Sequence, residues 1–258
     1  MISGLTAALA ARLGAGILLA GGLIGARWPA PPSYSRFLLT AATICFGVAL
    51  VLGTSRPEFW TWVVLLLGAS GLRLSVTRGT LLGSGRLALL LAGVGLLGAT
   101  VPGVFAATGD GSALLPALAH FAGTVLLGTT AAAMVLGHWY LVDTALSIRP
   151  LLFAANLFCA AALLRAAVAL LGLGAGGARE LALSQPADLI YSTTALFFSF
   201  RVITGLVAPL VVSWLVRGTV RIRSTQSATG LLYVALILVL FGELTAVFLE
   251  GVTGARLS

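Results

Sequence analysis

The chain has 258 residues, of which 59% are hydrophobic and only 9% are charged, and its mean hydropathy is +1.10. Soluble domains carry roughly a quarter charged residues, so this composition excludes an ordinary soluble fold. The formal net charge of +8 would suggest a nucleic-acid partner in a soluble protein. Here the basic residues are all arginine and gather in alternate loops, a pattern typical of membrane topology, so we expect no nucleic-acid partner.

Apolar stretches recur along the whole chain, each about long enough to cross a hydrocarbon core of roughly 30 Å. They predict an all-α, polytopic membrane protein with a single integral membrane domain over residues 1–258. In chain order the eight expected spans are 5–26, 37–54, 58–73, 86–106, 113–138, 150–173, 189–216 and 228–250. The span 58–73 is the shortest of them. No loop between the spans is long enough for a soluble domain.

The distribution of arginine orients the bundle. The loops after the first, third, fifth and seventh spans carry nine arginines, opposed by one acid, Asp143: Arg27, Arg36, Arg73, Arg78, Arg86, Arg149, Arg217, Arg221 and Arg223. The other side carries three: Arg56, Arg179 and Arg256. The positive-inside rule then places both termini in the periplasm and the chain in a bacterial inner (cytoplasmic) membrane, in contact with membrane lipids.

Five ionisable side chains are expected at nearly the same depth, each on a different span: Arg12, His120, Arg165, Arg201 and Glu243. A charge inside the bilayer costs several kcal/mol unless it is paired or hydrated, so such residues are first read as functional. We take His120, Arg165, Arg201 and Glu243 as candidate ligand-binding residues. Arg12 lies near the outer end of its helix, where snorkelling or a structural pairing is the expectation.

Glu243 and Arg201 lie at matched depth on consecutive antiparallel spans, so we expect them to pair. Three arginines against one glutamate leave this layer with a charge of about +2. Three kinds of site fit: a quinone site, a haem pocket with His120 as axial ligand, and a passage or cradle for an anionic substrate or lipid headgroup. A structural alternative is that the charges only fix helix packing.

Haem and metal binding are not expected from this chain alone. Its two histidines, His120 and His138, lie about five turns apart on one helix and cannot ligate the same iron. Met134 is about four turns from His120, which makes a His–Met haem equally hard to build. Cys45 and Cys159 show neither a C-x-x-C pattern nor metal-ligand spacing. We therefore expect no metal site and no covalently bound cofactor, and a quinone as the cofactor that fits best.

A second polar group lies where the fifth span meets the predicted cytoplasmic surface: His138, Trp139, Tyr140, Asp143 and Arg149. These side chains can exchange protons, donate hydrogen bonds or stack on a flat ring. Three interpretations fit: an aromatic belt with a polar turn, a site for a quinone headgroup, and a docking face for a cytoplasmic subunit.

Sequence motifs for hydrolysis and nucleotide binding do not occur. The chain has no H-E-x-x-H or G-x-S-x-G motif, and its seven acids make a two-metal hydrolase implausible. We therefore do not expect a stand-alone enzyme. The chain is expected to act as a non-catalytic or quinone-binding subunit of an oxidoreductase.

The eight spans, scarce histidines and buried polar residues broadly resemble the haem-free, quinol-interacting membrane anchors of bacterial oxidoreductases. This resemblance implies a subunit that depends on partner proteins for its redox centres. The leading expectation is an integral membrane subunit of a bacterial electron-transfer complex, respiratory or photosynthetic, that interacts with quinone. The alternatives are a small transporter or channel for an anionic or lipid-like substrate, and a purely structural scaffold subunit.

Overall fold

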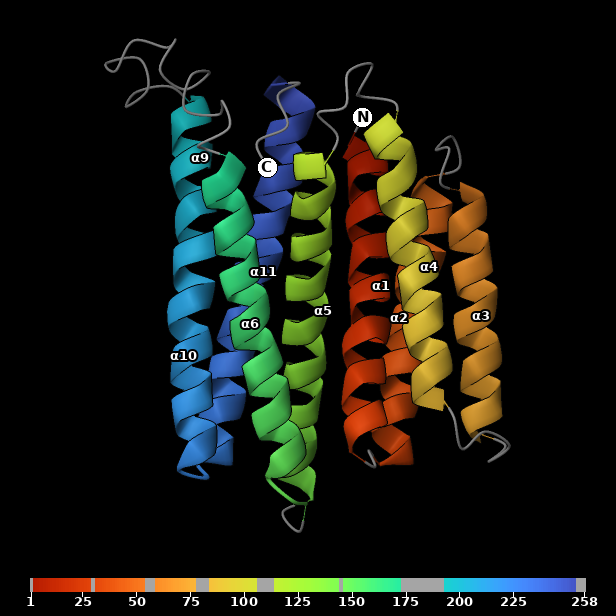
Figure 1. Ribbon diagram of the computed structural model, residues 1–258, viewed down its shortest axis with the longest axis vertical. Coiled ribbons are helices and arrows are strands. Elements are labelled where there is room, and N and C mark those ends of the chain that lie inside the picture. The colour runs from red at the N-terminus through yellow and green to blue at the C-terminus, as the bar shows by residue number, and fades with distance from the viewer. Residues whose placement is uncertain are drawn as a thin grey trace.

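The computed structural model is a bundle of long, roughly parallel and antiparallel helices (Figure 1). It describes residues 2–28, 31–53, 59–77, 84–105, 114–143, 146–172 and 193–253. The helices are α1 (Ile2–Arg27), α2 (Pro32–Leu52), α3 (Phe59–Thr77), α4 (Ser84–Phe105), α5 (Leu114–Val142), α6 (Arg149–Gly172), α9 (Thr193–Val202), the π-helical turn η2 (Ile203–Val207), α10 (Ala208–Arg221) and α11 (Thr225–Thr253). Because α9, η2 and α10 follow one another without a break, they form one rod.

The eight helical rods in this part of the chain coincide with the eight predicted spans, with ends that differ by five residues or fewer. Six of them are long and apolar enough to cross a membrane: α1, α2, α5, α6, α9 to α10, and α11. Within the described residues, α3 and α4 contribute the shorter apolar stretches Phe59–Leu74 and Leu87–Gly98. The all-α, multi-pass membrane architecture is thus confirmed.

The bundle has two halves (Figure 1). In the first half α1 packs against α2 and α4, while α3 packs against α2 and α4. In the second half α5 packs against α6 and α11, and α10 packs against the same two helices. The contact between α1 and α5 is the principal link between the halves, so the position of any group shared by them depends on this contact.

Two glycines bring α1 and α5 into backbone contact. A Cβ atom at Gly128 would overlap the backbone of Gly16, and a Cβ at Gly16 would overlap the carbonyl oxygen of Thr124. Helices in lipid lack a hydrophobic drive to associate, and small residues at the interface let their backbones approach and gain van der Waals contact. The two halves are therefore in backbone contact at Gly16 and Gly128, where there is no room for a Cβ atom.

The π-helical turn η2 has a local cause in Pro209. Proline lacks a backbone N–H, and inside a helix its ring clashes with the carbonyl group four residues earlier. The helix widens by one residue there, and the Ala208 N–H donates to the carbonyl of Ile203 instead. Gly205 of this turn lies against Gly242 of α11, where a Cβ at Gly205 would lie 3.2 Å from the Gly242 Cα. The widened turn thus packs directly beside the residue that precedes Glu243.

The α1–α5 seam gives a test of the fold. We expect Gly128→Ala to lower the free energy of unfolding by about 1–3 kcal/mol, because the added methyl group must push α1 away. Gly47→Ala is the matched control, since a Cβ at Gly47 of α2 meets nothing within 4 Å. Unfolding in mixed micelles titrated with sodium dodecyl sulfate measures both. Equal stability of the two variants would contradict the close α1–α5 contact.

Candidate ligand-binding site

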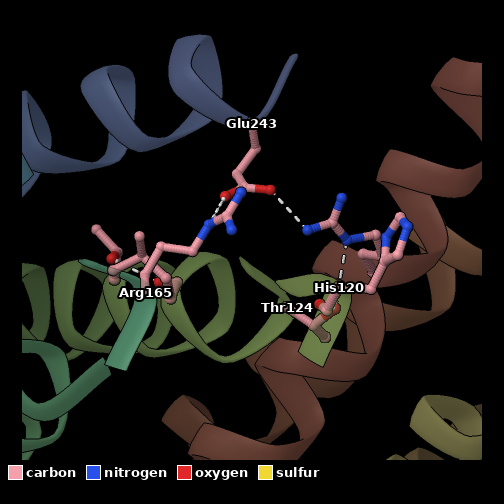
Figure 2. Close-up of polar contacts among 7 residues, drawn as sticks. His120, Thr124, Arg165 and Glu243 are labelled. Carbon is pink, nitrogen blue, oxygen red and sulfur yellow. Dashed lines mark hydrogen bonds and ion pairs between the residues drawn. The ribbon is translucent and has the colours of Figure 1, made fainter. Parts of the chain in front are cut away.

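Glu243 is the centre of a buried charged cluster. It lies on α11 with only 2% of its surface exposed. One carboxylate oxygen, Oε2, accepts a hydrogen bond from Arg12 Nη2 at 2.6 Å, and the other, Oε1, accepts one from Arg165 Nε at 2.8 Å. Figure 2 shows Arg165 and Glu243 pointing toward each other from α6 and α11. A single carboxylate therefore bridges two guanidinium groups, each with one oxygen.

Arg12 reaches Glu243 from the other half of the bundle. The residue is 6% exposed, and its Nε donates to Thr124 Oγ1 of α5 at 3.3 Å. The Thr124 hydroxyl in turn donates to the backbone carbonyl of His120 at 2.8 Å, one turn away on the same helix (Figure 2). The Arg12 side chain thus extends from α1 to α11, and its hydrogen bond with Thr124 of α5 orients the guanidinium.

Gly123 makes the passage across α5 possible. A Cβ atom at this position would overlap Arg12 Nη2 and would lie 2.5 Å from Glu243 Oε2. Real Cβ atoms essentially never approach a neighbour so closely, so any larger residue must displace the ion pair. Because Gly123 has no side chain, the ion pair between Arg12 and Glu243 can lie against the backbone of α5. This ion pair joins the two halves of the bundle.

Arg165 has a donor that the described protein leaves without an acceptor. The residue is 4% exposed, and its Nη1 atom is fully buried with no hydrogen-bond partner in the part of the chain that the structure describes. A buried donor without a partner costs about 1–3 kcal/mol, more when it belongs to a charged group. Nη1 is therefore the atom of this cluster that the described residues leave without an acceptor.

Arg201 adds a third positive charge. It is 5% exposed, lies at the end of α9 next to the π-helical turn, and interacts electrostatically with the Glu243 carboxylate. Its expected pairing with Glu243 remains a prediction, since the ion pairs described at this carboxylate are those with Arg12 and Arg165. The Gly205–Gly242 contact brings the two helices together at this level.

The cluster has a chemical bias toward hydrogen-bond acceptors. Counted over the described residues alone, its three guanidinium groups and one carboxylate carry a formal charge of +2, and arginine side chains only donate. Within the described residues no group of three or more His, Cys, Asp or Glu side chains is placed to hold a metal ion. What the arrangement can do is bind an anion or polarise a carbonyl oxygen with a charge-assisted hydrogen bond.

The structure brings together most of the residues expected from the sequence and adds others. Arg165, Arg201 and Glu243 meet in one cluster, and His120 lies half-buried on the neighbouring turn of α5. Arg12, expected to play only a structural part, makes the shortest contact with Glu243. The contribution of Gly123 and Thr124 of α5 does not follow from the sequence prediction. Its only signal in the sequence is a glycine–threonine pair three and four residues after His120.

The second polar group does not converge on one point. His138 Nδ1 lies 3.2 Å from the hydroxyl of Tyr233 on α11, and the His138 side chain is exposed. Trp139 instead faces α2, where its Nε1 donates to Ser33 Oγ at 3.1 Å. Its indole also meets the rings of Tyr34 and Phe37. These two neighbours therefore tie α5 to different helices.

The remaining members of this group lie at the turn between α5 and α6. The Tyr140 hydroxyl donates to the backbone carbonyl of Ser147 across the turn. Arg149 begins α6, and Tyr140, Ser147 and Arg149 line one open pocket. Asp143 is exposed just beyond the end of α5. Two of the five residues, Tyr140 and Arg149, thus share a cavity.

Comparison of the chain with family models, with curated proteins and with solved structures finds no match. A functional assignment must therefore come from the chemistry of the buried cluster. Among the described residues, that chemistry is defined by a carboxylate that bridges two guanidinium groups and by one buried donor, Arg165 Nη1, that has no acceptor there.

The role of Gly123 can be tested by non-additivity. Arg12→Leu and Gly123→Ala should each destabilise the protein, because both break the Arg12–Glu243 ion pair. The double variant should be no worse than the more damaging single variant, with a coupling energy of about 1–3 kcal/mol in unfolding measurements. Arg12→Leu combined with Gly93→Ala serves as the control, since a Cβ at Gly93 meets nothing within 4 Å. Additive losses in both pairs would refute the passage over Gly123.

Proposed function

We propose that this protein is an integral membrane subunit of an electron-transfer complex and that its buried charged cluster binds a quinone headgroup. The observation that carries the proposal is the buried Arg165 Nη1 donor, which has no acceptor among the described residues. A quinone carbonyl is a hydrogen-bond acceptor on a lipid-soluble molecule, so it can reach a donor inside the bilayer. A quinone carbonyl would therefore supply the hydrogen-bond acceptor that Arg165 Nη1 lacks among the described residues.

The residues have distinct parts in this proposal. Arg165 would hold one carbonyl oxygen through Nη1, and Arg201 would add a second positive charge that favours electron density on the ring oxygens. Glu243 would orient Arg165 through Nε and is the one group of the cluster that can exchange a proton. A bound quinone would supply the two-electron redox chemistry that these side chains lack.

The proposal includes partner subunits. The two histidines of the chain lie on one helix and cannot ligate one iron together. The electrons would therefore come from redox centres on other chains of the complex. The exposed apolar faces of the helices leave room for such partners as well as for lipid, for example at Trp60, which is 74% exposed.

A transporter for an anionic or lipid-like substrate is the second candidate. It is favoured by the formal +2 charge of the cluster, which suits an anion better than a neutral carbonyl, and by the π-helical turn beside it. Irregular turns within membrane helices are common where helices line binding sites. A scaffold role is less well supported, because a purely structural cluster has no use for the unmatched Arg165 donor.

Topology forms part of the proposal. We propose that all eight rods cross a bacterial inner membrane, with α1 beginning and α11 ending on the periplasmic side. Both of those helix ends lie at the same end of the bundle (Figure 1). The arginine count of the loops supports the direction.

Reporter fusions test this topology. Alkaline phosphatase joined after Ser258 should be active, because this enzyme folds only in the periplasm. Green fluorescent protein joined at the same place should be dark, because it does not become fluorescent after export by the general secretion route. A fusion in the turn between α10 and α11, after Arg223, should give the reverse pattern. The same reporter signal at the two positions would contradict an odd number of crossings between them.

Arg165→Lys tests quinone binding. Lysine keeps the positive charge near Glu243 but removes the planar fork that carries Nη1. We expect the wild-type protein, extracted from native membranes in mild detergent, to carry a near-equimolar amount of quinone and to copurify with redox subunits. The variant should assemble with the same subunits but lose most of the quinone, as measured by solvent extraction and chromatography.

Arg217→Lys is the control, because Arg217 donates to Asn156 at the exposed surface of α10. If the wild type emerges without quinone and without redox partners, the electron-transfer proposal fails. Uptake of an anion by vesicles containing the protein alone, abolished by Arg165→Lys, would then establish the transporter. Full quinone content in Arg165→Lys would show that the quinone binds elsewhere.

A further inference from the structure

A second basic group of residues lies at the opposite end of the bundle from the start of α1 and the end of α11. Here the turn between α5 and α6 meets the turn between α10 and α11, and together they enclose an open pocket of about 620 Å³. Its polar lining comes from both turns: Tyr140, Ser147, Arg149, Arg223 and Thr225. This pocket is separate from the Glu243 cluster, and the inference drawn from it does not depend on the proposed function.

The charge of the pocket is positive. Arg149 and Arg223 contribute two guanidinium groups from separate turns, and the described lining contains no carboxylate. Ser147 and Thr225 add hydroxyl groups beside them. Arginine is a forked donor, and two arginines lining one cavity match the several acceptor oxygens of a phosphate group better than a single carboxylate or a carbonyl.

Helix ends strengthen the positive potential. α6 begins at Arg149 and α11 begins at Thr225, so two long helices start at the wall of the same cavity. The first backbone N–H groups of a helix have no acceptor within the helix, and its start carries a partial positive charge. The two arginines and the two helix starts thus all favour an anion in the same space.

The backbone at Arg223 has an unusual conformation for an arginine. Its φ of 60° lies in the left-handed region, and it is the one non-glycine residue with positive φ in the described chain. The Arg223 N–H donates to the Val220 carbonyl and the Ser224 N–H donates to the Thr219 carbonyl, each at 3.0 Å. This is a helix C-cap in which glycine is the usual residue. The backbone conformation at this position favours glycine, but the chain has an arginine there.

We propose that this pocket binds the phosphate group of an anionic ligand through Arg149 and Arg223. The group can come from the headgroup of an anionic lipid or from a free phosphate in solution. A lipid source suits a pocket at the end of membrane-spanning helices, where basic residues attract anionic headgroups. In either case the ligand would bridge the α5–α6 and α10–α11 turns and hold the two helix pairs in register.

The Arg223→Gly variant separates binding from folding. Glycine relieves the left-handed backbone and removes the guanidinium, so the melting temperature should stay the same or rise while binding weakens. Arg149→Gln removes the second donor. Arg73→Gln is the matched control, because Arg73 is an exposed arginine on α3 in the other half of the bundle.

The measurement uses the delipidated full chain with two probes, phosphatidylglycerol against phosphatidylcholine in nanodiscs, and inorganic phosphate in detergent. We expect Arg223→Gly and Arg149→Gln each to weaken binding of the preferred probe about fivefold or more. Arg73→Gln should change it by less than about twofold, because an exposed distant charge is screened by salt.

The two probes identify the source of the phosphate. Preference for phosphatidylglycerol that inorganic phosphate does not compete away would indicate a lipid headgroup. Binding of inorganic phosphate without any lipid preference would indicate a free phosphate. The proposal is overturned if the wild type neither prefers phosphatidylglycerol to phosphatidylcholine nor binds inorganic phosphate. It is also overturned if Arg73→Gln weakens binding as much as Arg223→Gly.

Discussion

The bridging of Arg12 and Arg165 by the Glu243 carboxylate is the interaction on which the centre of this bundle depends. Glu243 is the one acid among the side chains that the structure describes as buried. Without it, three guanidinium groups would repel one another in a medium that solvates charge poorly. Because Arg12 belongs to α1 while Glu243 and Arg165 belong to α11 and α6, the same contact fixes how the two halves of the bundle meet.

The neighbouring backbone is shaped to allow this contact. Gly123 leaves a gap in α5 through which the ion pair passes, and the Gly16–Gly128 contact keeps α1 close enough for Arg12 to reach across. On the other side, the π-helical turn and the Gly205–Gly242 contact hold Arg201 near the same carboxylate. The arrangement is compact but unbalanced in charge. The proposed ligand site rests on Arg165 Nη1, a buried donor that has no acceptor among the described residues.

The sequence predicts the helices well, because their lengths follow from the thickness of a bilayer and their ends from proline, glycine and arginine. It also predicts that Arg165, Arg201 and Glu243 share a depth. It does not predict which of them touch, because hydropathy gives the depth of a residue but not its rotation about the helix axis. Arg12 shows this clearly: the sequence predicts its depth, yet its direction toward Glu243 depends on Gly123 of a helix more than a hundred residues away. His138 and Trp139 show the same limit from the other side. They are neighbours in the sequence, but successive residues of a helix point in different directions, so His138 contacts α11 and Trp139 contacts α2.

The most direct test of the account is an experimental structure of the protein isolated from its native membrane, determined by cryo-electron microscopy at a resolution that shows side chains. We expect Glu243 between Arg12 and Arg165, with density for a non-protein molecule within hydrogen-bonding distance of Arg165 Nη1. A structure in which Nη1 donates to a protein acceptor, with no other molecule beside it, would contradict the assignment of this cluster as a binding site.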